Sequence, residues 1–174
     1  CWAPHLTTTH NAPEPKRPMT SISAPLRRLL DLSAGFTSVL NALQPVAALA
    51  ARLYVAQVFF LSGLTKLRDW GTTVALFTDE YKVPLLSPQV AAFMGTAGEL
   101  VLPMLLVLGL GGRFAALGLF VVNAVAVIAL ADIPPAALQQ HILWGALLAG
   151  LAVYGPGAWS LDQVVSQRLK RLTS

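Results

Sequence analysis

Cysteine and histidine are almost absent from this sequence. The 174 residues include one cysteine, Cys1, so no disulfide and no Cys-x-x-Cys redox centre can form within the chain, and thiol exchange by this chain alone is excluded. Of the three histidines, His5, His10 and His141, only His141 lies in an apolar part of the sequence. One histidine cannot supply both axial ligands of a bis-histidine haem. No metal site and no catalytic residue are predicted.

Charge is also scarce. Charged residues make up 11% of the chain and hydrophobic residues 55%, whereas an average soluble domain carries about 25% charged residues. Most of the surface is therefore expected to face lipid, and the bilayer is the first predicted partner. The formal net charge of +4 comes from basic residues that flank apolar segments and form no stripe, so nucleic-acid binding is not predicted.

The N-terminal part divides into two predicted segments. Residues 1–20 are rich in proline and threonine and lack the apolar core of a signal peptide, which predicts a disordered extension. The residues before Met19 read as an upstream extension of the reading frame; the alternative is a lipidated Cys1, as in mature lipoproteins. Residues 21–45 show helical apolar spacing, which predicts an amphipathic helix on the membrane surface, or else a helical lead-in to the first span. Pro45 is expected to end that helix.

Residues 46–166 are predicted to form four transmembrane helices, because about 20 apolar residues of helix cross a bilayer. The expected spans are 46–67, 89–110, 113–131 and 138–154. Short connections make the second, third and fourth spans antiparallel neighbours. Residues 167–174 form a basic tail. The fold class is thus an all-α membrane protein, a four-helix bundle with an N-terminal amphipathic helix.

Basic residues predict the orientation of the bundle. With a cytoplasmic N-terminus, nine lysines and arginines fall on the cytoplasmic side and three, Lys66, Arg68 and Lys82, on the outer side. This positive-inside bias predicts that both termini are cytoplasmic, and Arg113 is interpreted as a topology anchor at the inner end of the third span.

Glu99 is the main candidate for a functional residue, because it is a lone carboxylate in the middle of the second span. An ionised side chain at the bilayer centre costs at least about 2.5–3.5 kcal/mol and needs a partner or a wet cavity. Counting along the spans places Gln57 and Asn123 at a similar depth. Arg52 is the expected partner of Glu99. The pair is either structural, fixing helix register, or forms a proton or quinone-headgroup site.

Lys66 and His141 are predicted to lie at the outer interface. Lys66 either extends its ammonium to the lipid headgroups or contacts an anion or quinone carbonyl together with His141. His141 is either simply hydrogen-bonded or protonates a quinone oxygen or binds a metal, because imidazole titrates near neutral pH.

Several short motifs follow one another along the four spans. They are Phe59 to Leu67 (FFLSGLTKL) with Trp70, Tyr81 to Pro88 (YKVPLLSP), Gly98-Glu99, Gly109 to Arg113 (GLGGR), His141 to Trp144 (HILW) and Gly155 to Asp162 (GPGAWSLD). In this order, and together with Arg52, they resemble the DoxX family of bacterial membrane proteins over about residues 46–166. The family-like polar positions are Arg52, Lys66, Glu99, Arg113 and His141.

The resemblance implies a four-helix protein of the bacterial inner membrane. The family takes its name from a subunit associated with a terminal quinol oxidase and with thiosulfate:quinone oxidoreduction. The implied function is an accessory subunit of a quinone-linked redox complex, with Arg52, Gln57, Lys66, Glu99, Asn123 and His141 lining a polar site. No covalent cofactor is implied. Quinone and redox partner subunits are implied, because the chain carries no redox centre of its own. The alternative is a non-redox membrane scaffold or a small-molecule carrier that acts as a homo-oligomer. Whether the chain is an enzyme stays open.

Overall fold

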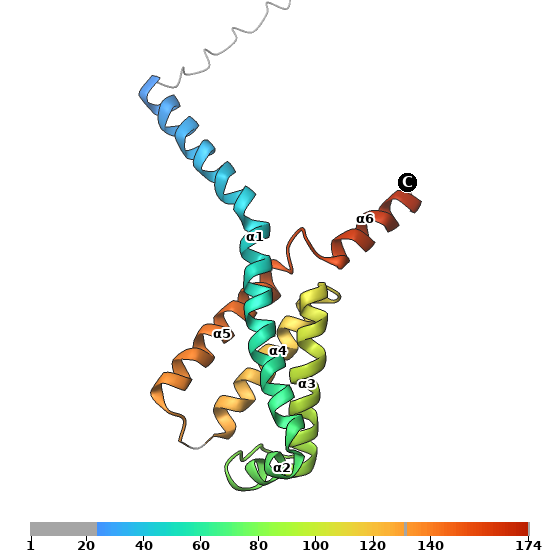
Figure 1. Ribbon diagram of the computed structural model, residues 1–174. Coiled ribbons are helices and arrows are strands. Elements are labelled where there is room, and N and C mark those ends of the chain that lie inside the picture. The colour runs from blue at the N-terminus through green and yellow to red at the C-terminus, as the bar shows by residue number, and fades with distance from the viewer. Residues whose placement is uncertain (1–23, 131, 174) are drawn as a thin grey trace, which may run out of the picture. The chain divides into compact units, whose positions relative to one another are not determined.

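The computed structural model describes residues 24–130 and 132–173, so the predicted extension over residues 1–20 lies outside the described part. The described chain is helical, with one isolated bridge between Tyr81 and Leu130 and no strand in these two ranges. Its helices, labelled in Figure 1, are α1 (Ala24–Arg68), α2 (Trp70–Asp79), α3 (Pro88–Leu108), α4 (Gly112–Ala129), α5 (Pro135–Tyr154) and α6 (Leu161–Thr173).

The predicted all-α membrane class is confirmed. Four helices, α1, α3, α4 and α5, are long and apolar enough to cross a membrane. They match the four predicted spans to within a few residues at the ends of α3, α4 and α5. Two shorter helices, α2 and α6, were not predicted, and the expected start of a basic tail at residue 167 falls inside α6.

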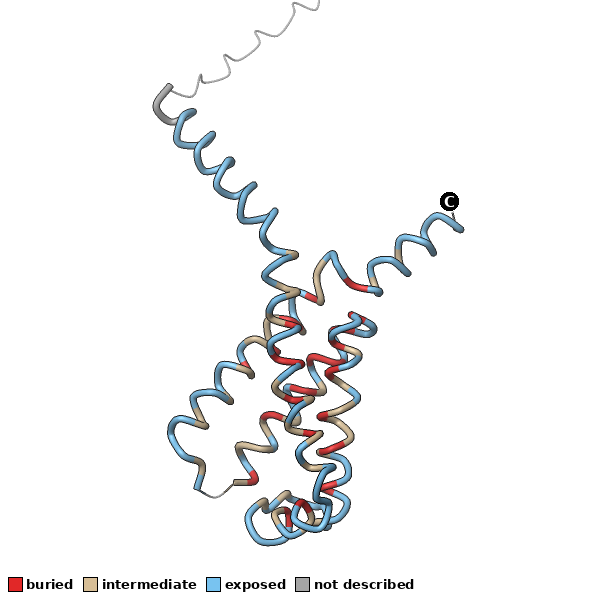
Figure 2. Tube along the Cα trace, in the orientation of Figure 1, coloured by how far each residue is buried: buried red, intermediate tan, exposed pale blue. Residues whose placement is uncertain are grey.

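The expectation that Pro45 ends the first helix is wrong, since α1 continues through it. Proline removes one backbone donor and leaves the neighbouring hydrogen bonds of the helix in place, so a long helix can accommodate it. The chain divides into two compact units, Cys1–Ser38 and Val39–Ser174. The described part of the first unit is helical, and its side chains from Arg27 to Ser38 are exposed (Figure 2).

The core of the second unit lies among the four long helices. Its members are Val55 and Phe59 of α1, Leu106 of α3, Ala115, Ala116 and Leu119 of α4, and Leu148 and Leu151 of α5. Helix α3 packs on α4 and α4 packs on α5, as the short connections predict. Buried positions are confined to one stripe of each long helix, and the remaining faces are exposed (Figure 2).

Helix α2 folds back beside the start of α3. Asp69 caps its N-terminus by accepting hydrogen bonds from Thr72 N at 3.0 Å and Thr72 Oγ1 at 2.6 Å, which lower the pKa of the Asp69 carboxyl. The buried Thr73 hydroxyl donates to the carbonyl oxygen of Lys66 at 2.8 Å. Phe77 then packs on Ala91 and Ala92 of α3. Helix α2 is therefore attached both to the end of α1 and to the first turns of α3.

The turn between α3 and α4 depends on glycine. Gly109 ends α3 with φ of 68°, and Gly111 precedes α4 with φ of 55°, both in the left-handed region that side chains disfavour. A Cβ atom on Gly109 would lie 2.5 Å from Cβ and 2.9 Å from Cα of Ser160, in the segment between α5 and α6. The glycine thus allows two distant segments to touch at this end of the bundle.

Replacing Gly109 with alanine is expected to destabilise the bundle. The left-handed conformation alone costs a non-glycine residue about 1–2 kcal/mol, and the clash with the Ser160 backbone adds to it. We expect a loss of about 2 kcal/mol or more, measured as a lower thermal midpoint of the purified protein in detergent.

The matched control is Gly150→Ala. Gly150 lies within α5, and apart from its chain neighbours and the adjacent backbone of its own helix, no described atom lies within 4 Å of a Cβ built there. Alanine should be neutral or slightly stabilising at this helical position. Equal midpoints for the two variants would contradict the proposed contact of Gly109 with Ser160.

Candidate functional site

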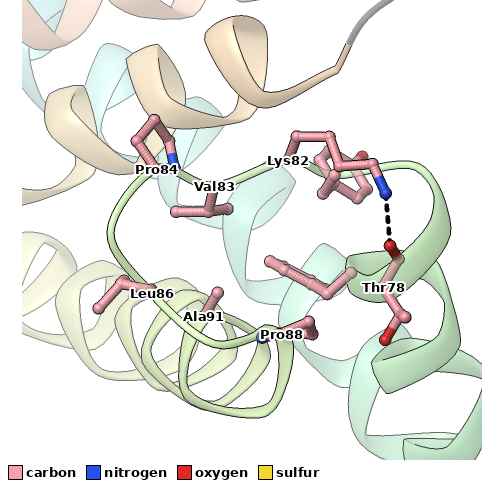
Figure 3. A pocket seen from close by; sticks show the side chains of 9 residues that line it. Thr78, Lys82, Val83, Pro84, Leu86, Pro88 and Ala91 are labelled. Atoms are coloured by element: carbon pink, nitrogen blue, oxygen red, sulfur yellow. Dashed lines mark hydrogen bonds between the residues drawn. The ribbon is translucent and has the colours of Figure 1, made fainter.

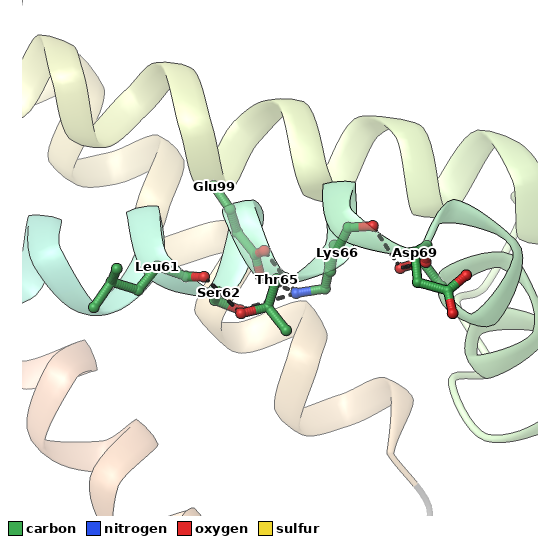
Figure 4. A network of polar contacts seen from close by, with 7 residues as sticks. Leu61, Ser62, Thr65, Lys66, Asp69 and Glu99 are labelled. Atoms are coloured by element: carbon green, nitrogen blue, oxygen red, sulfur yellow. Dashed lines mark hydrogen bonds and ion pairs between the residues drawn. The ribbon is translucent and has the colours of Figure 1, made fainter.

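Glu99 forms an ion pair with Lys66. The Lys66 ammonium donates to Glu99 Oε1 at 2.7 Å, to Glu99 Oε2 at 2.6 Å and to the hydroxyl of Ser62 at 3.0 Å (Figure 4). The two charged side chains are 17% and 10% exposed, so the pair is largely but not fully enclosed. All three ammonium protons have acceptors, and both carboxylate oxygens are engaged.

The expected partnership of Glu99 with Arg52 is wrong. Lys66 follows Arg52 by 14 residues, which is roughly 21 Å along a helix at 1.5 Å per residue, and it is Lys66 that reaches Glu99. Gly63 permits the close approach of α1 to α3 at this level, since a Cβ atom there would lie 2.9 Å from the Leu100 side chain and 3.2 Å from Glu99 Cβ. Counting residues into each span does not give the neighbour that Glu99 faces, and α3 meets α1 at Gly63, six residues after Gln57.

Two further polar groups of α3 lie close to the ion pair. Thr96 is one turn before Glu99 on the same face, is 3% exposed, and its hydroxyl has no hydrogen-bond partner among the described residues. Pro103, inside α3, has no N–H, so the backbone carbonyl of Glu99 loses its usual helical donor four residues on. A buried hydroxyl and a carbonyl are thus available beside the charged pair.

An apolar groove lies between α1 and α3, the two helices that the ion pair joins. Its volume is about 460 Å³, and its walls are Leu53, Ala56, Gln57 and Phe60 of α1 and Pro103, Met104, Val107 and Leu108 of α3. Phe60 and Pro103 lie about one helical turn along the axis from Gly63 and Glu99 respectively, and neither Lys66 nor Glu99 is among the wall residues. Gln57 is its one hydrophilic wall residue.

Asn123 and His141 form a second polar contact, between α4 and α5. The Asn123 amide donates to the His141 carbonyl oxygen at 2.9 Å, and its Oδ1 lies 2.8 Å from Nδ1 of His141. The imidazole contacts Trp144 edge-on with ring centroids 5.0 Å apart, and Trp144 in turn contacts Phe59 of α1 at 5.9 Å.

The structure therefore does not gather the predicted polar residues into one site. Lys66 and Glu99 are paired between α1 and α3, Asn123 and His141 between α4 and α5, and Gln57 lines the groove. Among the described residues, Lys66 and His141 bond to different partners, and their predicted shared contact with an anion or quinone carbonyl stays a prediction. Sequence reasoning missed Ser62 and Thr96, which are small hydroxyl residues of a kind that is common in membrane helices.

Arg52, 14 residues before Lys66 in α1, binds backbone carbonyls. It is 1% exposed and donates to the carbonyl oxygens of Leu106 at 3.0 Å, Val107 at 2.5 Å, Pro156 at 2.7 Å and Trp159 at 2.9 Å. Its planar, forked donors suit several fixed acceptors at once. Arg52 thereby joins α1 to the end of α3 and to the segment between α5 and α6.

Asp162, in the first turn of α6, completes this end of the bundle. Its carboxylate accepts from the backbone N–H groups of Gly111 and Gly112 at 2.9 Å each, at the start of α4, and its own N–H donates to the Gly109 carbonyl at 3.0 Å. A carboxylate is favourable there because a helix N-terminus carries partial positive charge. We call Arg52, Asp162 and the backbone groups that they bind the clamp.

A separate pocket of about 390 Å³ lies at the α2 end of the bundle. Its walls are Phe77, Thr78, Tyr81, Lys82, Val83, Pro84, Leu86, Pro88 and Ala91. At its rim, Lys82 Nζ donates to the Thr78 carbonyl at 2.6 Å (Figure 3). Burial raises the pKa of the Tyr81 phenol, and the negative charge of Glu99 raises it further, so the phenol stays uncharged at neutral pH.

Comparison with protein families adds one finding to this geometry. The family model of DoxX matches residues 47–132. The chain belongs to the DoxX family. The DoxX match extends over the spanning part of α1 through α4, and it contains Arg52, Lys66, Glu99 and Asn123. No curated protein and no solved structure matches the chain. The family and the four spanning helices together make it a multi-pass membrane protein of the DoxX family.

Replacing Arg52 with lysine is expected to destabilise this DoxX protein although the charge is kept. One ammonium group has three protons and cannot satisfy four carbonyls in two segments, and each buried acceptor left without a donor costs about 1–3 kcal/mol. We expect a loss of about 3 kcal/mol, read from the thermal midpoint in detergent.

The matched control is Arg113→Lys. Arg113 is exposed at the start of α4 and should tolerate the change, because the contacts of an exposed basic side chain contribute little to stability. If both variants kept the wild-type midpoint, Arg52 would not have the structural role that its hydrogen bonds indicate.

Proposed function

We propose that this DoxX-family protein is an accessory subunit of a quinone-linked redox complex of the bacterial inner membrane. The observation that carries the proposal is an acid–base pair, Lys66–Glu99, held between two spanning helices that also enclose an apolar groove, whose nearest wall residue Pro103 is one helical turn from Glu99. Such a combination suits an amphiphile with a small polar head and a long apolar tail. Quinones and quinols have this form.

The residues around the pair have the donors and acceptors that a quinone or quinol head needs. The Lys66 ammonium can donate to a carbonyl oxygen, and Glu99 can accept from a hydroxyl. The unpartnered Thr96 hydroxyl can do either. When bound, the quinone supplies the electron and proton chemistry, and the protein supplies binding and orientation. Partner subunits would carry the remaining electron-transfer groups.

The groove supports the same proposal because it suits the apolar tail of a quinone. It follows α1 and α3 away from the ion pair, and its walls are apolar apart from Gln57. Ligand sites commonly combine apolar walls with a few convergent polar groups. The tail would lie along Phe60, Pro103 and Met104, with the head at Lys66 and Glu99.

The alternative is a scaffold or carrier without a redox role, working as a homo-oligomer. The hydrogen bonds of Lys66 favour this alternative, because Glu99 and Ser62 already accept from all three ammonium protons. A pair satisfied in this way can simply lock α1 against α3. The quinone experiment below separates the two functions.

Retention of quinone should depend on the charged pair. We expect the protein purified in mild detergent to contain quinone by solvent extraction and mass spectrometry, and Glu99→Gln to lose most of it. The double variant Lys66→Met/Glu99→Leu should also lose quinone while staying folded, because replacing both partners of a buried ion pair by apolar residues is often neutral or stabilising.

Glu80→Gln is the matched control, since it neutralises an exposed carboxylate after α2 and should retain quinone. Two results would contradict the proposal: a wild-type protein free of quinone, or a folded double variant that retains it. Either would leave the scaffold or carrier function.

The proposed orientation places both termini and the clamp on the cytoplasmic side. It rests on the excess of basic residues around that end of the helices. We expect a fluorescent protein fused after Ser174 to fluoresce and alkaline phosphatase fused there to be inactive, because the latter folds only after export.

A phosphatase fusion in the connection between α2 and α3, residues 80–87, should be active and serves as the positive control. The opposite pattern at the two sites would invert the proposed topology.

A further inference from the structure

Helix α6 has two unlike faces. Leu161, Val164, Val165, Leu169 and Leu172 recur at helical spacing, and each is at least 41% exposed. Asp162, Gln163, Ser166 and Gln167 occupy the other side. A helix of this pattern that directly follows the last membrane-spanning helix has an apolar face that water disfavours.

Two arginines lie at the apolar face rather than opposite to it. At 100° per residue, Arg168 falls between Val164 and Leu172, and Arg171 falls at the edge beside Val164. Long basic side chains can lie along an apolar surface and extend their charge to the polar boundary. This arrangement fits a phosphate layer above hydrocarbon better than a purely apolar protein surface.

Asp162 fixes where α6 begins. Through its bonds to Gly111, Gly112 and Gly109, the first turn is tied to the turn between α3 and α4, which is the end of two spanning helices. Spanning helices are expected to end at the membrane surface. Helix α6 therefore begins near that level.

We propose that α6 lies in the membrane surface, with its apolar face among the lipid chains and Arg168 and Arg171 bound to the phosphates of anionic lipids. The charge of the two arginines is complementary to an anionic headgroup layer, which attracts basic residues next to a membrane span. The lipid of the surrounding bilayer is the ligand. Asp162 is a positioning residue, since its carboxylate is already engaged by backbone N–H groups.

The experiment measures which face of α6 is in lipid. Cys1 is replaced by serine in the full-length chain, and a nitroxide label is attached to Val165→Cys or, on the opposite face, to Gln163→Cys. Each protein is placed in nanodiscs of phosphatidylcholine, with or without the anionic lipid phosphatidylglycerol. Collision with oxygen reports lipid, and collision with a water-soluble nickel chelate reports water.

In anionic nanodiscs, we expect the ratio of oxygen to nickel accessibility to be several-fold higher at residue 165 than at residue 163. The difference should shrink markedly in phosphatidylcholine alone and in Arg168→Gln/Arg171→Gln. Arg27→Gln/Arg28→Gln is the matched control, because it removes the same charge from another exposed helical segment and should keep the difference.

Three results would overturn the proposal. Equal ratios at the two positions would mean that α6 does not lie in the membrane surface. A difference that is independent of anionic lipid and of the two arginines would exclude the headgroup contact. Protection of residue 165 from both reagents would mean that protein, such as a second copy of the chain, covers the face.

Discussion

The architecture depends on the hydrogen bonds that the buried guanidinium of Arg52 makes. A guanidinium that is almost fully enclosed must have its N–H groups bonded, and here four carbonyl oxygens from two other parts of the chain serve that purpose. No carboxylate of the described residues forms an ion pair with it. The end of α3, where Leu106 and Val107 are, carries the partial negative charge of a helix C-terminus, which helps to compensate the cation together with the charge of nearby Asp162. The charge therefore fixes backbone segments to one another.

The clamp and the ion pair have different consequences for function. Arg52 has several acceptors that belong to the backbone, so its contacts cannot be exchanged without moving helices. Lys66 and Glu99 bond to each other through flexible side chains, which can separate and bind a third group without any helix moving. The pair is electrically neutral as a whole, so it costs the membrane interior less than a lone carboxylate would. Ligand exchange therefore requires less rearrangement at the ion pair than at the clamp.

The sequence allowed the fold to be predicted further than the site. Long apolar segments and short connections identified the spans, because crossing a bilayer demands length and apolarity whatever the detailed packing. Glu99 was recognised as an unusual charge, but its neighbour depends on the rotation of α1 relative to α3, which residue counting does not give. The start of α2 did carry a signal, Asp69 followed by Thr72 and Thr73, that is typical of a helix N-cap. The glycine motifs around residues 109–113 and 155–162 are far apart in the sequence, and only the fold brings them together at Arg52.

The contact between Asn123 and His141 determines which nitrogen of the imidazole carries the proton. Because the Asn123 amide nitrogen donates to the His141 carbonyl, its oxygen faces Nδ1, and that nitrogen must carry the hydrogen. In the neutral ring, Nε2 is then left with a lone pair. His141 is thus set up to receive a proton or a hydrogen bond at Nε2 rather than to give one. Any partner of this histidine would have to approach as a donor, along the edge of the ring that Asn123 leaves open.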